Sequence, residues 1–133
     1  MGSEKNQGVV LKFVRSINNQ NPAEMLSLMS DNHRLIDAHG AEFSGKEKME
    51  AAWQAYFDLF PDYRIDVTDI FESDNIVALF GSASGTFRGD KKKKENVWHL
   101  PAAWKAIVVE GKIEQWQVYA DTKIPFEIIE RNS

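Results

Sequence analysis

The stretch NVWHLPAAWKAIVVEGKIEQWQVYAD, residues 96–121, decides the fold of this 133-residue chain. Apolar residues recur through it in two runs, which predicts long β-strands over residues 96–109 and 112–121. Glu110-Gly111 lies between the two runs and predicts a tight turn. Proline lacks the amide hydrogen that a sheet needs, so Pro101 favours a bulge or an edge position in the first strand.

Two more strands precede this hairpin. Residues 64–71 alternate between apolar and polar, and residues 76–87 form a long run that Gly81 and Gly85 interrupt. Glycines inside a strand favour bulges or a sharp bend. A further short strand is expected over residues 33–39, which also alternate.

The first half of the chain predicts three helices. Apolar residues at helical spacing place them over residues 9–17, 22–29 and 44–60. Asn21 is the expected N-cap of the second helix. The third is expected to open with a capping box between Ser44 and Glu47 and to stop at Pro61.

Helices followed by long strands predict a single α+β domain over residues 1–133. We expect a cone-shaped roll of three N-terminal helices packed in a strongly curved antiparallel sheet. Residues 1–7 are expected to be disordered or an expression-vector remnant, and residues 122–133 to form a C-terminal tail. A cone that its own side chains leave unfilled contains a cavity, the usual site for a small ligand.

Composition excludes several classes of protein. The chain has no cysteine, which rules out disulfides, thiolate metal sites and cysteine nucleophiles. The net charge is −4 and the basic cluster at residues 91–94 is flanked by Asp90 and Glu95, which argues against nucleic-acid binding. No run approaches the roughly 18 apolar residues of a membrane span, and residues 1–7 lack the apolar core of a secretory signal. We expect a cytoplasmic protein without membrane or nucleic-acid partners.

Several segments carry a resemblance to known families. They are Phe60-Pro61-Asp62 leading into residues 63–67, Ser84-Gly85-Thr86-Phe87, and Glu110-Gly111-Lys112-Ile113 leading to Trp116 and Asp121. Through them the chain resembles the SnoaL-like polyketide cyclases and the ketosteroid isomerases of the nuclear transport factor 2-like superfamily. The resemblance spans roughly residues 9–121 and implies that the cone-shaped roll is cystatin-like. It specifies the fold better than the reaction, because this fold hosts many activities.

The resemblance implies that Asp37 is a general base, since the ketosteroid isomerases carry a carboxylate at the matching position. Asp37 and His39 are two residues apart on an expected strand and therefore share a face. His39 would then position a substrate oxygen or share a proton with Asp37. The alternative is a solvated Asp and His at a strand end beside Gly40.

Asp121 is the second candidate acid or base, because the resemblance places it where SnoaL-like cyclases carry an acidic residue at the end of the last strand. Its neighbours Trp116, Val118 and Tyr119 are apolar or amphipathic, which suits proton transfer. The alternative is a strand-end aspartate whose charge lies in water.

Other residues argue against steroid isomerisation. The resemblance implies an oxyanion hole, but Phe13 stands in place of its tyrosine, and Ala103 or Trp104 in place of its acid. The epoxide hydrolases of the superfamily need an arginine that the long strand lacks. We expect the ligand to be bound by other histidine and aromatic side chains, namely Phe13, Trp53, Tyr56, Phe57, His99, Trp116 and Tyr119. The indole N–H groups of Trp53, Trp98, Trp104 and Trp116 and the hydroxyls of Tyr56 and Tyr119 are candidate donors. Each of these aromatic residues has a structural alternative in the core, and His99 a further one as an interface residue.

These observations leave more than one function open. We expect a SnoaL-like enzyme that isomerises or cyclises a small apolar carbonyl compound in the cavity without a cofactor. The alternatives are a non-catalytic binder of a small hydrophobic ligand and a protein-interaction module, and the residues do not separate the first two. No metal is expected, because His33, His39 and His99 lack ligand spacing. A homodimer through the sheet face is expected, because residues 97–109 are apolar on both faces.

Overall fold

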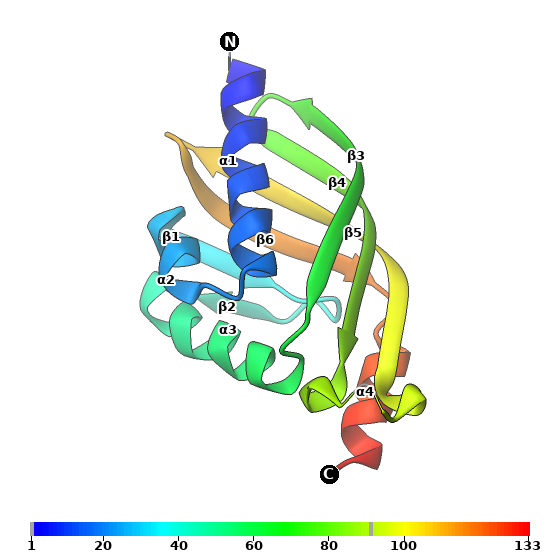
Figure 1. Ribbon diagram of the computed structural model, residues 1–133. Helices are drawn as coiled ribbons and strands as arrows, with labels where there is room; N and C mark the ends of the chain where they lie inside the picture. Colours follow the sequence, from blue (N-terminus) through cyan, green and yellow to red (C-terminus); the bar gives the residue numbers. More distant parts are fainter. Residues whose placement is uncertain (1, 91) are drawn as a thin grey trace.

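The computed structural model describes residues 2–90 and 92–133 and has an α+β architecture (Figure 1). One sheet of six strands has the order β2-β1-β6-β5-β4-β3. The strands are β1 (Met29–Ile36), β2 (Glu42–Ser44), β3 (Arg64–Ser73), β4 (Ile76–Thr86), β5 (Val97–Val109) and β6 (Lys112–Ala120). The helices are α1 (Gly2–Asn18), α2 (Pro22–Ser27), α3 (Lys46–Leu59) and α4 (Lys123–Arg131).

The β5–β6 hairpin has the tight turn that the sequence predicts. Glu110 and Gly111 both have positive φ, 51° and 75°, as in the turns whose twist matches that of paired strands. Pro101 pairs with Ser82 of β4, while β6 ends opposite Ala102, so Pro101 has a neighbouring strand on one side only. The edge position expected for Pro101 is therefore confirmed, and β5 alternates regularly through it.

Gly81 makes room for a bulge in β3. The β3–β4 register shifts between Val67 and Asp69, so that Thr68 is the extra residue opposite Gly81 and Phe80. A Cβ at position 81 would lie 1.9 Å from the backbone oxygen of Asp66. The bulge that the glycine predicts is confirmed, and bulges bend a strand and increase its twist.

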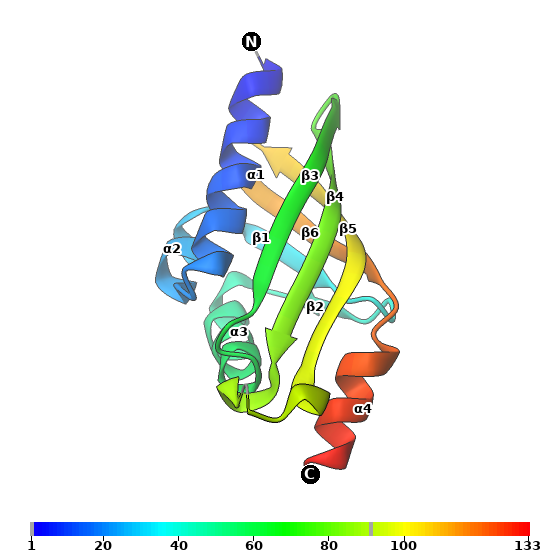
Figure 2. The same cartoon turned by 45° about the vertical axis from the view of Figure 1, so that its right-hand side comes forward.

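Three helices lie on one side of this bent sheet. Figures 1 and 2 show α1, α2 and α3 together on that side. The core joins apolar side chains of the helices to the facing positions of the sheet, among them Val10, Phe13, Ile17, Met25, Met49, Phe57, Leu79, Trp104, Ile113 and Trp116. As predicted, Asn21 caps α2, where its side-chain oxygen accepts the amide hydrogen of Glu24 at 3.2 Å.

The prediction of an antiparallel sheet is wrong for one pair of strands. β1 runs parallel to β6, with Leu35 opposite Trp116. Parallel neighbours need a long connection, and here the chain makes β2, α3, β3, β4 and β5 between the two strands. The sheet is therefore mixed.

The prediction of exactly three helices and a tail is also wrong. Residues 122–133 contain a fourth helix, α4, whose Pro125 and Ile128 are buried. Residues 2–7, expected to be disordered, belong to α1. None of the helices in the described part of the chain is long and apolar enough to cross a membrane.

The capping box expected at the start of α3 does not form. Ser44 is the last residue of β2 and pairs with Arg34 of β1. Gly45 takes the N-cap position with φ of 101°, and in the described part of the chain no side chain caps the first turn of the helix. Pairing in the sheet has displaced the local capping interaction.

Candidate functional site

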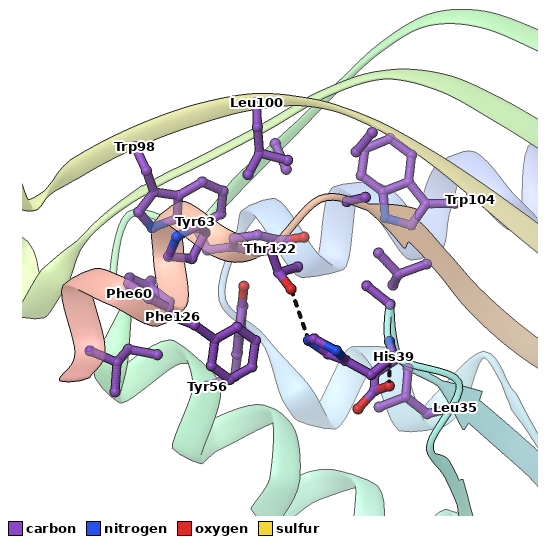
Figure 3. Close-up of a pocket in the computed structure, with 18 of the residues that line it drawn as sticks. Leu35, His39, Tyr56, Phe60, Tyr63, Trp98, Leu100, Trp104, Thr122 and Phe126 are labelled. Atoms are coloured by element: carbon purple, nitrogen blue, oxygen red, sulfur yellow. Dashed lines mark hydrogen bonds between the residues drawn. The ribbon is translucent and has the colours of Figure 1, made fainter.

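A cavity of about 340 Å³ lies between the sheet, α3 and α4 (Figure 3). This volume is at the small end of the range of ligand pockets, about 300–1,000 Å³. Aromatic and aliphatic side chains dominate the wall: Leu35, Phe43, Ala52, Trp53, Tyr56, Phe60, Tyr63, Ala83, Trp98, Leu100, Ala102, Trp104, Val118, Ala120, Pro125, Phe126 and Ile129. The cavity therefore suits a small, largely apolar molecule.

Regular alternation along β5 determines which of its residues reach the cavity. Trp98, Leu100, Ala102 and Trp104 are two residues apart and lie on the inner face. Gly85 of β4 leaves room for the indole of Trp98, because a Cβ there would lie 3.0 Å from that ring. The cavity wall thus depends on a glycine behind it.

The polar part of the cavity is formed by Asp37, His39 and Thr122. Oδ1 of Asp37 accepts the backbone N–H groups of His39 at 2.9 Å and of Ala41 at 3.0 Å. These bonds orient the half-buried carboxylate in the turn after β1. Both of these hydrogen bonds involve Oδ1. In the described structure, Oδ2 is therefore available to a ligand.

His39 connects this turn to the start of α4. Its Nε2 lies 2.9 Å from Oγ1 of Thr122, the dashed contact in Figure 3. Its ring also packs edge-on against Phe126, with 5.1 Å between the ring centroids. At its other end, α4 is followed by Asn132, whose Nδ2 donates to Oδ1 of the buried Asn96 at 3.0 Å. These contacts hold the helix against the cavity.

Two tyrosines place their rings in the wall. Tyr56 of α3 and Tyr63, just before β3, have perpendicular rings with centroids 4.9 Å apart. Burial raises the pKa of the Tyr56 hydroxyl. Burial and the nearby Tyr56 raise the pKa of the Tyr63 hydroxyl well above its usual value. Both phenols therefore remain protonated at physiological pH.

The indole groups make poorer hydrogen-bond donors to a ligand. Trp53, Trp98 and Trp104 line the cavity, but each Nε1 atom is buried without a hydrogen-bond partner in the described structure. An atom that is inaccessible to water is also inaccessible to a ligand in this conformation. The rings offer mainly apolar contact.

Several residues expected to bind the ligand lie in the core instead. Phe13, Phe57 and Trp116 are at most 3% exposed and do not line the cavity. The Phe13 and Trp116 rings contact each other, with 5.0 Å between their centroids. Phe57 and Trp116 lie behind the cavity wall, where their rings pack against those of Trp53 and Trp104 with centroids 5.6 and 6.4 Å apart.

Two other expected ligand residues lie on the outer face of the sheet. His99 alternates with the cavity-lining Trp98 and Leu100, and its side chain is exposed. Tyr119 is 51% exposed and alternates with Val118 and Ala120, which line the cavity. The placement of His99 and Tyr119 in the ligand site is therefore corrected.

Asp121 lies outside the main cavity. It borders a neighbouring hollow of about 240 Å³, where its Oδ1 accepts the backbone N–H of Lys123 at 3.1 Å. Because β6 ends at Ala120, Asp121 belongs to the turn into α4 rather than to the strand. The structure thus brings Asp37 and His39 together in the main cavity, whereas Asp121 meets His39 only in the neighbouring hollow.

Sequence reasoning missed Tyr63, Thr122 and Phe126. Tyr63 follows directly on the Phe60-Pro61-Asp62 segment that carries the family resemblance. Thr122 and Phe126 belong to the segment expected to be a tail, in which Ile124, Phe126, Ile128 and Ile129 give a helical pattern of apolar residues. That pattern was the available signal for a helix over the cavity. The described residues contain no group of three or more His, Cys, Asp or Glu side chains able to hold a metal ion.

Comparison with known proteins gives a family match over most of the chain. The model of the SnoaL-like domain matches residues 10–116. No curated protein sequence matches the chain.

Solved structures with the same fold are numerous. A Jannaschia sp. CCS1 protein assigned as a SnoaL-like polyketide cyclase is 16% identical, with a TM-score of 0.78 and 92% of each chain covered. An LEH-like epoxide hydrolase of M. tuberculosis is 12% identical, with a TM-score of 0.79 and coverage of 96% of this chain and 91% of that one. A ketosteroid isomerase-like protein of Catenulispora acidiphila in complex with trimethylamine is 19% identical, with a TM-score of 0.71 and coverage of 84% and 83%. At these identities the likeness establishes a shared fold.

Proposed function

We propose that this chain, which belongs to the SnoaL-like domain family, binds a small apolar carbonyl compound and isomerises or cyclises it without a cofactor. The observation that carries the proposal is one carboxylate in an otherwise apolar wall. Of the described residues that line the cavity, Asp37 alone has a carboxyl group. A carboxylate so placed is suited to take a proton from a carbon next to a carbonyl group.

The surroundings of Asp37 support its use as a base. Two backbone N–H groups fix Oδ1, so the orientation of the carboxylate is set before a ligand binds. The aromatic wall excludes water from the apolar body of the ligand. His39 and Thr122 line the same polar side of the cavity and are bonded to each other, which holds their side chains in place near the carboxylate.

A non-catalytic binder is the second candidate. It is supported by the outward position of Asp121, which leaves the cavity one acidic group instead of the two expected from sequence. In that case ligand affinity would not depend on proton transfer, and no substrate would be turned over.

A screen of small ketones by thermal shift and turnover tests the proposal, with a variant that blocks the cavity. Ala52→Trp adds a large side chain at a cavity-lining position of α3, and we expect it to abolish the ligand-induced rise in Tm. Ala51→Trp is the matched control, because Ala51 is an exposed neighbour on the same helix that does not line the cavity. Equal ligand responses in the two variants would contradict binding in the cavity.

We also propose that two copies pair through the outer face of the sheet. Phe71, Phe80 and Tyr119 are 61%, 46% and 51% exposed there, and Phe80 and Tyr119 both lie opposite Ala103. Exposed aromatic groups on one face favour association. Light scattering is expected to give twice the 15.2 kDa of one chain, and Phe80→Glu to shift the protein toward one chain. A monomeric parent protein at micromolar concentration would refute this pairing.

A further inference from the structure

Tyr56 and Tyr63 are polar groups that the cavity encloses and that the base chemistry above does not use. Tyr56 rises from α3 into the cavity in Figure 3, and Tyr63 enters from the segment before β3. Their rings meet at 86° with centroids 4.9 Å apart. Two phenols from separate elements are therefore gathered at one place in the wall.

The two hydroxyls are available to a ligand. Among the described residues, no protein group forms a hydrogen bond with either hydroxyl, and neither oxygen is among the buried atoms that lack both solvent and a partner. A hydroxyl group without a hydrogen-bond partner in an apolar cavity carries a free-energy penalty, and an acceptor on a ligand removes that penalty. Burial raises the pKa of both phenols, so they can donate hydrogen bonds and do not become anions.

Other candidate donors in the cavity are occupied or inaccessible. The indole nitrogens of Trp53, Trp98 and Trp104 are buried. Nε2 of His39 is already bonded to Thr122. The two tyrosines are thus the free neutral donors of the aromatic wall in the described structure.

We propose that Tyr56 and Tyr63 together bind the carbonyl oxygen of the ligand and stabilise the negative charge that forms on it. This inference rests on the proposed function, because it concerns the same cavity and the same class of ligand. The two tyrosines would supply the hydrogen-bond donors that are missing at Phe13 and at positions 103 and 104.

The proposed step is balanced in protons and electrons. The Asp37 carboxylate takes a proton from the carbon next to the carbonyl, the C–H electron pair forms a C=C bond, and the carbonyl π pair moves onto oxygen. The phenols of Tyr56 and Tyr63 donate hydrogen bonds to that oxygen and keep their protons. When the enolate is conjugated with a second C=C bond, the protonated Asp37 returns its proton to the far carbon of that system and the electron pair on oxygen re-forms the C=O bond, which completes an isomerisation. Return of a proton to the original carbon only exchanges its hydrogen. A donor that acts on the developing oxyanion contributes about 10²–10³-fold to a rate.

Binding of two matched probes tests the inference. 1-Tetralone is a bicyclic ketone, and tetralin has the same skeleton without the oxygen. By calorimetry we expect the parent protein to bind the ketone about tenfold more tightly than the hydrocarbon, from hydrogen bonds of ordinary strength. Tyr56→Phe and Tyr63→Phe are each expected to reduce this preference, and the double variant to remove it, while tetralin binding stays the same.

Tyr119→Phe is the matched control, because Tyr119 is the remaining tyrosine of the chain and lies on the outer face. It is expected to keep the full preference for the ketone. The infrared carbonyl stretch of bound 1-tetralone provides a readout on the unaltered protein, independent of whether the variants fold. We expect it to lie at lower frequency than in a hydrocarbon solvent.

The outcomes separate this inference from the function on which it rests. Equal affinity of the parent for both probes, or a bound carbonyl stretch at its hydrocarbon-solvent frequency, would overturn the tyrosine pair and leave cavity binding intact. Failure of both probes to bind would overturn the proposed function together with this inference. A ketone preference that persists in the double variant would assign the donor role to other residues.

Discussion

Replacement of Gly81 with alanine is expected to lower the free energy of unfolding by about 3 kcal/mol or more, or to prevent folding. The added Cβ would lie 1.9 Å from the backbone oxygen of Asp66 and 2.9 Å from its carbonyl carbon. Neither atom is the end of a flexible side chain, so relief requires movement of the bulged strand β3. Urea unfolding followed by tryptophan fluorescence measures the effect.

Gly8→Ala is the control for this substitution. Gly8 lies within α1, and nothing lies within 4 Å of a Cβ built there. Alanine in a helix is favoured over glycine, so this variant is expected to gain about 0.5–1 kcal/mol. A Gly81→Ala protein within about 0.5 kcal/mol of the parent would show that the bulge does not hold the backbone this closely.

Asp37→Asn is expected to reduce proton abstraction from a bound ketone by about 10²–10⁴-fold, the usual contribution of a positioned base. An amide of the same shape can still accept the N–H groups of His39 and Ala41 through its oxygen, so the turn is preserved. Exchange of the hydrogens at C2 of 1-tetralone in D₂O, followed by NMR, measures this step without knowledge of the natural substrate. Affinity for the ketone is expected to change little.

Asp121→Asn is the matched control, because Asp121 caps the backbone of Lys123 outside the main cavity. Its exchange rate is expected to stay within about twofold of the parent, since it does not line the wall. Absence of any exchange above buffer in the parent would eliminate the catalytic proposal and leave a ligand-binding protein. Equal rates in the parent and Asp37→Asn would show that another group is the base.

Local features of the sequence predicted several turns, caps and bulges, although the capping box expected at Ser44 did not form. The Glu110-Gly111 turn, the cap at Asn21 and the bulge beside Gly81 each follow from the conformational preferences of one or two residues. The parallel pairing of β1 with β6 joins segments that are distant in sequence, and no local pattern encodes it.

The candidate site was harder to predict because it depends on which face of each strand points inward. A shift of one residue in register moves every side chain to the opposite face. Residues 97–109 are apolar on both faces, so hydropathy alone could not decide between His99 and Trp98 as the cavity-lining residue. Thr122 and Phe126 were missed because α4 was expected to be a tail, although its apolar residues recur at helical spacing.

The helix α4 contributes to the cavity wall without being part of the sheet. One side of the cavity is lined by Pro125, Phe126 and Ile129 of α4. This helix follows β6, the last strand of the sheet. Substitutions of these three residues are therefore expected to alter the size and shape of the cavity while the strands stay the same. The segment of residues 123–131 is therefore a place where substitutions at exposed or cavity-lining positions change the cavity without changing the strands.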